Sequence, residues 1–181
     1  KIIGLLLVVG GVLYLVFSFR TDHSWGVASI FSKSANNEQR ITSDELNKFT
    51  SMTIDARNVN VRVLQGASSE AIFRLSGSVG LRSNAKLELK ENNDTLSVHT
   101  GGSTGFLHFT NATLSVELPA HEWNKFELKT SSGNIRLEQY TLKELTVQST
   151  SGNLTLNDLT AVKFDAKSTS GNIKMDALGN T

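Results

Sequence analysis

Two pairs of carboxylates are equally spaced in the last third of the chain, and they are the side chains best suited to hydrolytic chemistry. Glu127 and Asp165 form one pair, and Glu138 and Asp176, at the same separation, form the other. A glycosidase needs two carboxylates about 5 Å apart to retain, or about 6.5–9.5 Å apart to invert, the configuration of the sugar. Whether these acids can act together therefore depends on the elements that carry them.

Other catalytic and metal-binding patterns are missing from the sequence. The chain has no cysteine, and its histidines, His23, His99, His108 and His121, do not have a zinc-binding spacing. The glycine-rich loop Gly101–Gly105 lacks the Lys-Ser/Thr of a phosphate-binding loop. We therefore expect no metal and no cofactor. The net charge of +1 provides no basic surface for a nucleic acid.

The acids belong to a 19-residue sequence that occurs three times without a gap, at residues 125–143, 144–162 and 163–181. In each copy, apolar and polar residues alternate on both sides of Ser-Gly-Asn, which predicts two strands joined by a turn. One coil cannot close a core alone, whereas stacked coils share one. The inward positions after the turn are Ile135, Leu154 and Ile173, followed by Leu137, Leu156 and Met175.

The fold class predicted from this repeat is all-β, a β-solenoid or β-helix-like stack. Neighbouring coils lie about 4.8 Å apart, and a neutral residue, Thr146 or Asn157, falls between the two acids of each pair. The paired carboxylates would then be about 10 Å apart, outside both glycosidase geometries. We expect no enzyme. The alternative is a polysaccharide-active β-helix enzyme, which would need three or more acids converging on one face.

The Ser-Gly-Asn turns supply the predicted structural residues. Glycine and asparagine tolerate a positive φ better than most residues, so we expect a turn that uses this conformation. Three hydroxyl residues precede each glycine, and they can either bind glycan or wall polymer or bond to the turn backbone. The turn positions are Gly133, Asn134, Gly152, Asn153, Gly171 and Asn172.

The N-terminal residues predict a membrane anchor. Ile2–Phe19 has no charge, and 18 residues of helix span about 27 Å, close to the roughly 30 Å hydrocarbon core. We predict a single transmembrane helix within residues 1–20, with the C-terminal domain outside the cell. A signal peptide cleaved near Val27-Ala28-Ser29 and a buried core helix are the alternatives.

The remainder divides into three stretches. Residues 21–40 form a linker, residues 41–124 an irregular β region, and residues 125–181 three regular coils that read as truncated at the C-terminal end. A short helical segment within Ile41–Phe49 would cover the open end of the solenoid. We also expect Trp123 to pack on the first coil. A hairpin is predicted to pair Leu87 and Leu89 with Leu96 and Val98.

The turns SSGNI, STSGNL and STSGNI, with Leu118-Pro119 before them, resemble an adhesin-like bacterial β-solenoid domain of unknown function from about Phe49 to the end. With its apolar N-terminus the chain is similar to the membrane-anchored LiaG-type protein of the cell-envelope stress operon in Gram-positive bacteria. The resemblance implies a non-enzymatic surface scaffold or binding module linked to envelope stress. Its expected partners are the membrane and either cell-wall polymer or an envelope protein.

Overall fold

The computed structural model describes residues 4–9, 12–17, 32–34, 37–80, 86–101 and 109–179. They belong to two compact units, Lys1–Ile30 and Phe31–Thr181. In the first unit, β1 (Gly4–Val9) and β2 (Val12–Phe17) pair antiparallel.

The predicted N-terminal helix is therefore not supported. The segment is rich in valine and aromatic residues, which favour strands, and a uniformly apolar run has no periodicity that separates helix from strand. No helix among the described residues is both long enough and apolar enough to cross a membrane.

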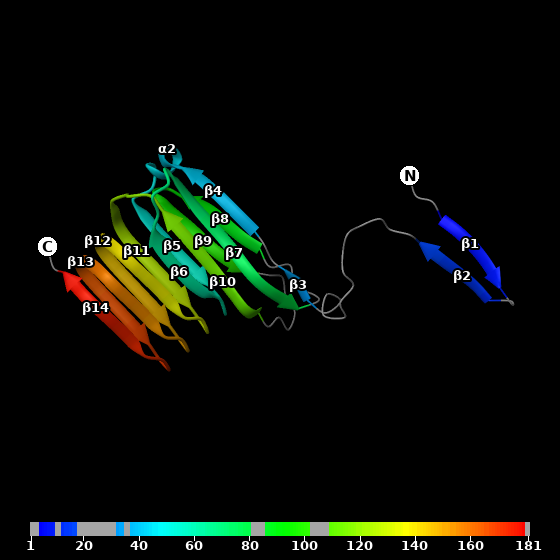
Figure 1. Cartoon of the computed structure of the whole chain (residues 1–181). Coiled ribbons are helices and arrows are strands. Elements are labelled where there is room, and N and C mark those ends of the chain that lie inside the picture. Colours follow the sequence, from blue (N-terminus) through cyan, green and yellow to red (C-terminus); the bar gives the residue numbers. More distant parts are fainter. Residues whose placement is uncertain are drawn as a thin grey trace. The chain divides into compact units, whose positions relative to one another are not determined.

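The second unit consists almost entirely of strands (Figure 1). Two of them, β3 and β4, begin inside the stretch predicted as linker. In chain order the elements are β3 (Ser32–Ser34), β4 (Asn37–Thr42), α2 (Ser43–Leu46), β5 (Ser51–Ala56), β6 (Asn60–Gln65), β7 (Glu70–Gly80), β8 (Lys86–Asn92), β9 (Thr95–Gly101), β10 (Phe109–Leu118), β11 (Trp123–Thr130), β12 (Ile135–Ser149), β13 (Leu154–Ser168) and β14 (Ile173–Gly179).

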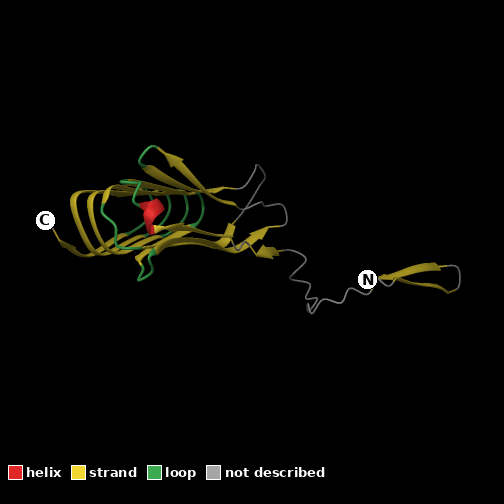
Figure 2. Cartoon of the chain, turned by 90° about the horizontal axis from the view of Figure 1, so that it is seen from above, coloured by secondary structure: helices red, strands yellow, loops and turns green. Residues whose placement is uncertain are grey.

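The C-terminal strands form the predicted solenoid in the predicted register. Ile135 of β12 pairs with Leu154 of β13, which pairs with Ile173 of β14, always 19 residues on and in parallel. The long strands β12 and β13 bend from one layer of the stack into the other (Figure 2). Gln139 and Asp158, one coil apart, have positive φ values of 61° and 51° at this bend, so each strand ends one coil and begins the next.

The coils do not stack in sequence order. The first regular coil rests on an earlier coil made of β5 and β6, because β11 pairs with β5 and β12 with β6. On their other sides, β5 and β6 pair in parallel with β9 and β10, which come later in the chain. The β5–β6 coil is thus enclosed between two coils that follow it in sequence.

Antiparallel strands end the stack on the N-terminal side. β7 pairs antiparallel with β10, and β4 with β7. On the other layer β8 pairs antiparallel with β9, which confirms the predicted hairpin, and Asn93 at its tip has a φ of 53°. Leu89 pairs with Val98 as predicted, whereas Leu87 pairs with Thr100 rather than with Leu96. The predicted short helix is also present as α2, with Thr42 as its N-cap and Glu45 completing a capping box.

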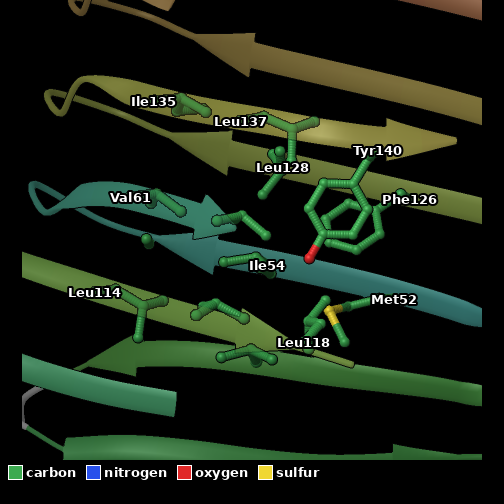
Figure 3. Packing of buried hydrophobic residues seen from close by; sticks show 14 of the residues in the cluster. Met52, Ile54, Val61, Leu114, Leu118, Phe126, Leu128, Ile135, Leu137 and Tyr140 are labelled. Carbon is green, nitrogen blue, oxygen red and sulfur yellow. The ribbon is translucent and has the colours of Figure 1, made fainter. Parts of the chain in front are cut away.

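One hydrophobic core runs through all the coils. Inward side chains from successive coils stack on one another, as Figure 3 shows for Phe126 and Tyr140 beside Met52 and Leu118. Leu46 and Phe49 from the α2 region join the same core. Trp123 is buried and packs edge-on against Phe126 with ring centroids 5.8 Å apart, as predicted.

The last coil leaves its inward side chains partly uncovered. Ile173 and Met175 are 42 % and 45 % exposed, whereas Leu154 and Leu156 in the preceding coil are buried. Among the described residues, core-facing positions of this coil are therefore covered on one side only.

Candidate functional site

The turns of the three regular coils form one continuous edge, here called the turn edge, at residues 130–134, 149–153 and 168–172. Backbone hydrogen bonds join each turn to the next, for example from the Ser151 N–H to the Ser131 oxygen at 2.9 Å. Asparagine side chains add a second ladder. The Asn153 N–H donates to Asn134 Oδ1, and the Asn172 N–H donates to Asn153 Oδ1, both at 2.9 Å. The turn asparagines therefore connect coils.

The turn glycines are required for space, and the prediction of a positive φ at the turn is wrong. Gly77 is the only described glycine with a positive φ, and the turn asparagines are not among the other residues that have one. A Cβ atom on Gly152 would lie 2.7 Å from the carbonyl carbon of Gly133 and 2.8 Å from Ser149 Oγ. A Cβ atom on Gly171 would likewise lie 2.7 Å from the carbonyl carbon of Gly152. Backbone from the preceding coil fills the place of a side chain.

The asparagine ladder extends beyond the repeats that the sequence revealed. Asn60 Oδ1, in the β5–β6 coil, accepts a hydrogen bond from the Asn134 N–H at 3.0 Å. Gly133 packs on the carbonyl group of Val59 as the later glycines pack on one another. The only sequence signal for this coil is Asn60 followed by Val61, because the position of the turn glycine is held by valine.

A hollow of about 370 Å³, here called the turn-edge groove, lies beside these turns. Strand pairing aligns Asp55, Lys129, Gln148 and Lys167 in one row along it. Its described lining residues are all polar: Asp55, Lys129, Thr130, Ser131, Gln148, Ser149, Thr150, Lys167 and Thr169.

The hydroxyl residues of the turn edge divide into two kinds. Two inner ones bond to the backbone: Thr130 Oγ1 donates to the Val59 oxygen at 3.4 Å and Ser168 Oγ to the Gly152 oxygen at 3.0 Å. The third, Ser149, has a buried hydroxyl with no hydrogen-bond partner among the described residues. Outer ones, Ser131, Thr150 and Thr169, are exposed. The structural interpretation therefore fits Thr130 and Ser168, whereas the outer hydroxyls are open to solvent.

The paired carboxylates do not converge on a common point. In each pair a neutral residue on the intervening strand separates the acids, so that Thr146 lies between Glu127 and Asp165. Glu138 accepts a hydrogen bond from Arg136 at 2.7 Å, and this bond lowers the pKa of its carboxyl group. A glycosidase acid requires the opposite shift.

The histidines are dispersed. His99 Nδ1 lies 4.0 Å from Asp55 Oδ2, and His121 Nε2 lies 2.8 Å from the Phe49 oxygen. His108 and most of the glycine-rich loop, like His23, lie outside the described residues. Within the described residues, no three metal-binding side chains come together.

The chain matches the family model described as Toastrack DUF4097 over residues 49–179. No curated protein sequence matches it. A solved structure from Clostridium sporogenes, provisionally named a cell adhesion protein, has a TM-score of 0.52 and 8% identity and aligns with 81% of this chain and 100% of its own.

Two further solved structures are provisionally named adhesins. That from Parabacteroides distasonis has a TM-score of 0.48 and 13% identity, covering 82% of this chain and 67% of its own. That from Bacteroides fragilis has a TM-score of 0.40 and 13% identity, covering 82% and 97%. At such identity the likeness to the clostridial structure concerns the fold alone.

Proposed function

The chain belongs to the Toastrack DUF4097 family, and on this premise we propose that it is a non-enzymatic binding module of the cell surface, tethered to the membrane by its N-terminal apolar segment. The clostridial structure with the same fold is provisionally named a cell adhesion protein, which supports a surface role. The observation that carries the proposal is the turn-edge groove, where polar groups recur with the spacing of the coils.

A cell-wall polymer is the partner that this groove suits best. A protein interface usually has an apolar centre, whereas every described lining residue of the groove is polar. Lys129 and Lys167 are two coils apart in one row, which places their strands about 10 Å from each other. Exposed hydroxyls recur at every coil between them. A polymer with hydroxyls and regularly spaced anionic groups can contact several coils at once.

Replacing Lys129 and Lys167 together by glutamine should weaken binding to purified, insoluble wall polymer on the order of tenfold. Each exposed ion pair contributes roughly 0.2–1 kcal/mol, and the two contributions add because the sites are separate. Binding is measured by co-sedimentation at low and physiological salt.

The matched control replaces Lys90 and Lys174 by glutamine. It makes the same change in net charge at other strands, β8 and β14, and both lysines are exposed. The control should bind like the unmodified protein. Equal loss in both double variants would mean that net charge alone drives binding, and no loss in either would exclude the groove as the binding site.

Membrane tethering rests on the sequence of Ile2–Phe19, which has no charge and belongs to a compact unit separate from the β domain. The full chain should remain in the membrane fraction after a carbonate wash, because an apolar segment of this length partitions into hydrocarbon. A chain beginning at Phe31 should be released. Recovery of a shortened, soluble product beginning near Ser29 would instead identify a signal peptide.

We also propose on which side of the membrane the β domain lies and which cellular response it serves. With the N-terminal segment in the cell membrane, the β domain would lie outside the cell and within reach of wall polymer. The similarity to LiaG-type proteins suggests that polymer binding serves the response to envelope stress. Exposure of the β domain to added protease on intact cells tests the orientation, since a cytoplasmic domain would be protected.

A further inference from the structure

The two ends of the described solenoid are covered to different degrees. At the end formed by β4 and β8, Gln39 reaches from one layer to the other, where its Nε2 donates to the Leu87 oxygen at 2.8 Å. At the opposite end, here called the open end, β14 and residues 163–168 of β13 are the last described strands of their layers (Figure 1). Two of the three large apolar side chains that are exposed among the described residues, Ile173 and Met175, lie on the open end.

The backbone of β14 is oriented to pair with a further strand. In a parallel pair, the N–H and C=O groups of one residue point to the same neighbouring strand. The Leu154 N–H donates to the Asn172 oxygen in the following coil. Ile173 is the equivalent of Leu154 one coil later, so the N–H and C=O groups of Ile173, and of Met175 two residues on, point away from the described strands.

The other layer has the same polarity. The Ser149 oxygen accepts a hydrogen bond from the Thr169 N–H in the following coil. Ser168 is the equivalent of Ser149 one coil later, so its backbone groups and those of Ala166 also point to the open end. Open strand edges of this kind are templates for pairing with another chain.

The charges of β14 are arranged so that the strand complements a second copy of itself. Lys174 and Asp176 flank Met175 on the outer face and form an ion pair at 3.1 Å. If two copies of β14 pair antiparallel about Met175, Lys174 of each copy lies opposite Asp176 of the other. Opposite charges at directly facing positions stabilise a strand pair, and like charges destabilise it.

Residues 163–168 of β13 have the same property about Ala166, which Asp165 and Lys167 flank. Ala166 lies four residues before Ser170, and Met175 lies four residues after Gly171, so both are equally far from the turn that joins their strands. A single two-fold axis can therefore relate both strand pairs at once.

The charges also exclude the other antiparallel way of joining two open ends. If β14 of one copy paired instead with residues 163–168 of the other, the equal distances from the turn would place Lys174 opposite Lys167. Asp176 would likewise lie opposite Asp165. Only the arrangement in which each strand pairs with its own copy brings unlike charges together in both layers.

We propose that the open end binds the open end of a second copy of this chain, about a two-fold axis beside Met175 and Ala166. Both layers then continue from one copy into the other through antiparallel strand pairs. Ile173 and Met175 of each copy become covered. A two-fold interface requires a self-complementary surface, which the alternating charges provide. This proposal does not rest on polymer binding at the turn-edge groove.

Single cysteines test the register, because the chain has none of its own. In the full chain in detergent, mild oxidation should link Met175→Cys into a disulfide-bonded dimer. Directly opposite residues of an antiparallel pair have Cα atoms about 4.5–5.5 Å apart, and disulfides join Cα atoms about 4.4–6.8 Å apart.

Ile173→Cys is the matched control, since Ile173 and Met175 are almost equally exposed. In the proposed register, residue 173 lies four residues, about 14 Å along the strand, from residue 173 of the other copy. This variant should remain unlinked. Linking of both variants to the same extent, of Ile173→Cys alone, or of neither would overturn the proposal.

A charge exchange tests the interface without a covalent bond. Asp176→Lys places like charges opposite each other twice in the dimer and should raise the dissociation constant roughly tenfold, as measured by sedimentation of the full chain in detergent. The double variant Lys174→Asp, Asp176→Lys should restore the original value, because it exchanges the two charges of each pair.

Glu88→Lys is the control for the change in net charge. Glu88 forms a similar ion pair with Lys90, at 3.4 Å, on β8 at the opposite end of the solenoid, and its replacement should leave the dissociation constant unchanged. A chain that sediments as a monomer would overturn the proposal. So would a dimer that is insensitive to Asp176→Lys, because association would then use another part of the chain, such as the N-terminal apolar segment.

Discussion

Gly152→Ala is expected to destabilise the β domain by about 3 kcal/mol, at the upper end of the range for overpacking a well-packed site. The added methyl group would meet the carbonyl group of Gly133, which belongs to the backbone of the preceding coil. That backbone cannot move aside without disturbing the hydrogen bond between Asn153 and Asn134. Urea denaturation of residues 31–181 measures the change in the free energy of unfolding.

Gly101→Ala is the matched control, because a Cβ atom there meets no atom of the described residues within 4 Å and the residue has no positive φ. Its effect should stay within about 0.5 kcal/mol, as for an ordinary surface change. If the two alanine variants prove equally stable, the close approach of the coils at Gly152 does not exist in solution.

Leu154→Ala should cost about 2–5 kcal/mol through the cavity that it leaves. Leu154 is fully buried and lies in the stack between Ile135 and Ile173, so that neighbours on both sides would lose contacts. The adjacent change Thr155→Ala, on the outer face, should cost under about 0.5 kcal/mol. Both are measured by the same denaturation experiment.

The comparison of these adjacent residues tests the assignment of strand faces. The alternation of β13 places Leu154 inward and Thr155 outward. A one-residue error in register would exchange the two, because side chains on a strand alternate between faces. Equal losses of stability in the two variants would therefore contradict the solenoid register.

The regular coils could be predicted because their information is local. The period, the apolar columns and the pairing of Ile135 with Leu154 all follow from one repeated sequence. The position of the β5–β6 coil could not be predicted from the sequence, because the pairing between β6 and β12 joins residues that share no repeat. The similarity of this coil to the repeats is also hard to detect, because Val59 occupies the position of a turn glycine.

Sequence also identified which turn residues matter without identifying why. A glycine can be required for its φ or for the space that a Cβ would fill, and composition does not separate the two. Here space is the reason at Gly133 and Gly152. Positive φ values occur instead at Gln139 and Asp158, at the other bend of the coil, where the residue types give little warning.

During synthesis the ribosome delivers the β5–β6 coil before either of the coils that enclose it. Until β9–β10 and β11–β12 emerge, both edges of strands bearing Met52, Ile54, Val61 and Val63 lack their final partners. Open apolar edges pair readily with other chains, so this interval is when the nascent protein is most prone to aggregate. Each later coil needs only the 19 residues that follow its template, and this short loop closure favours rapid, directional growth toward the C-terminus.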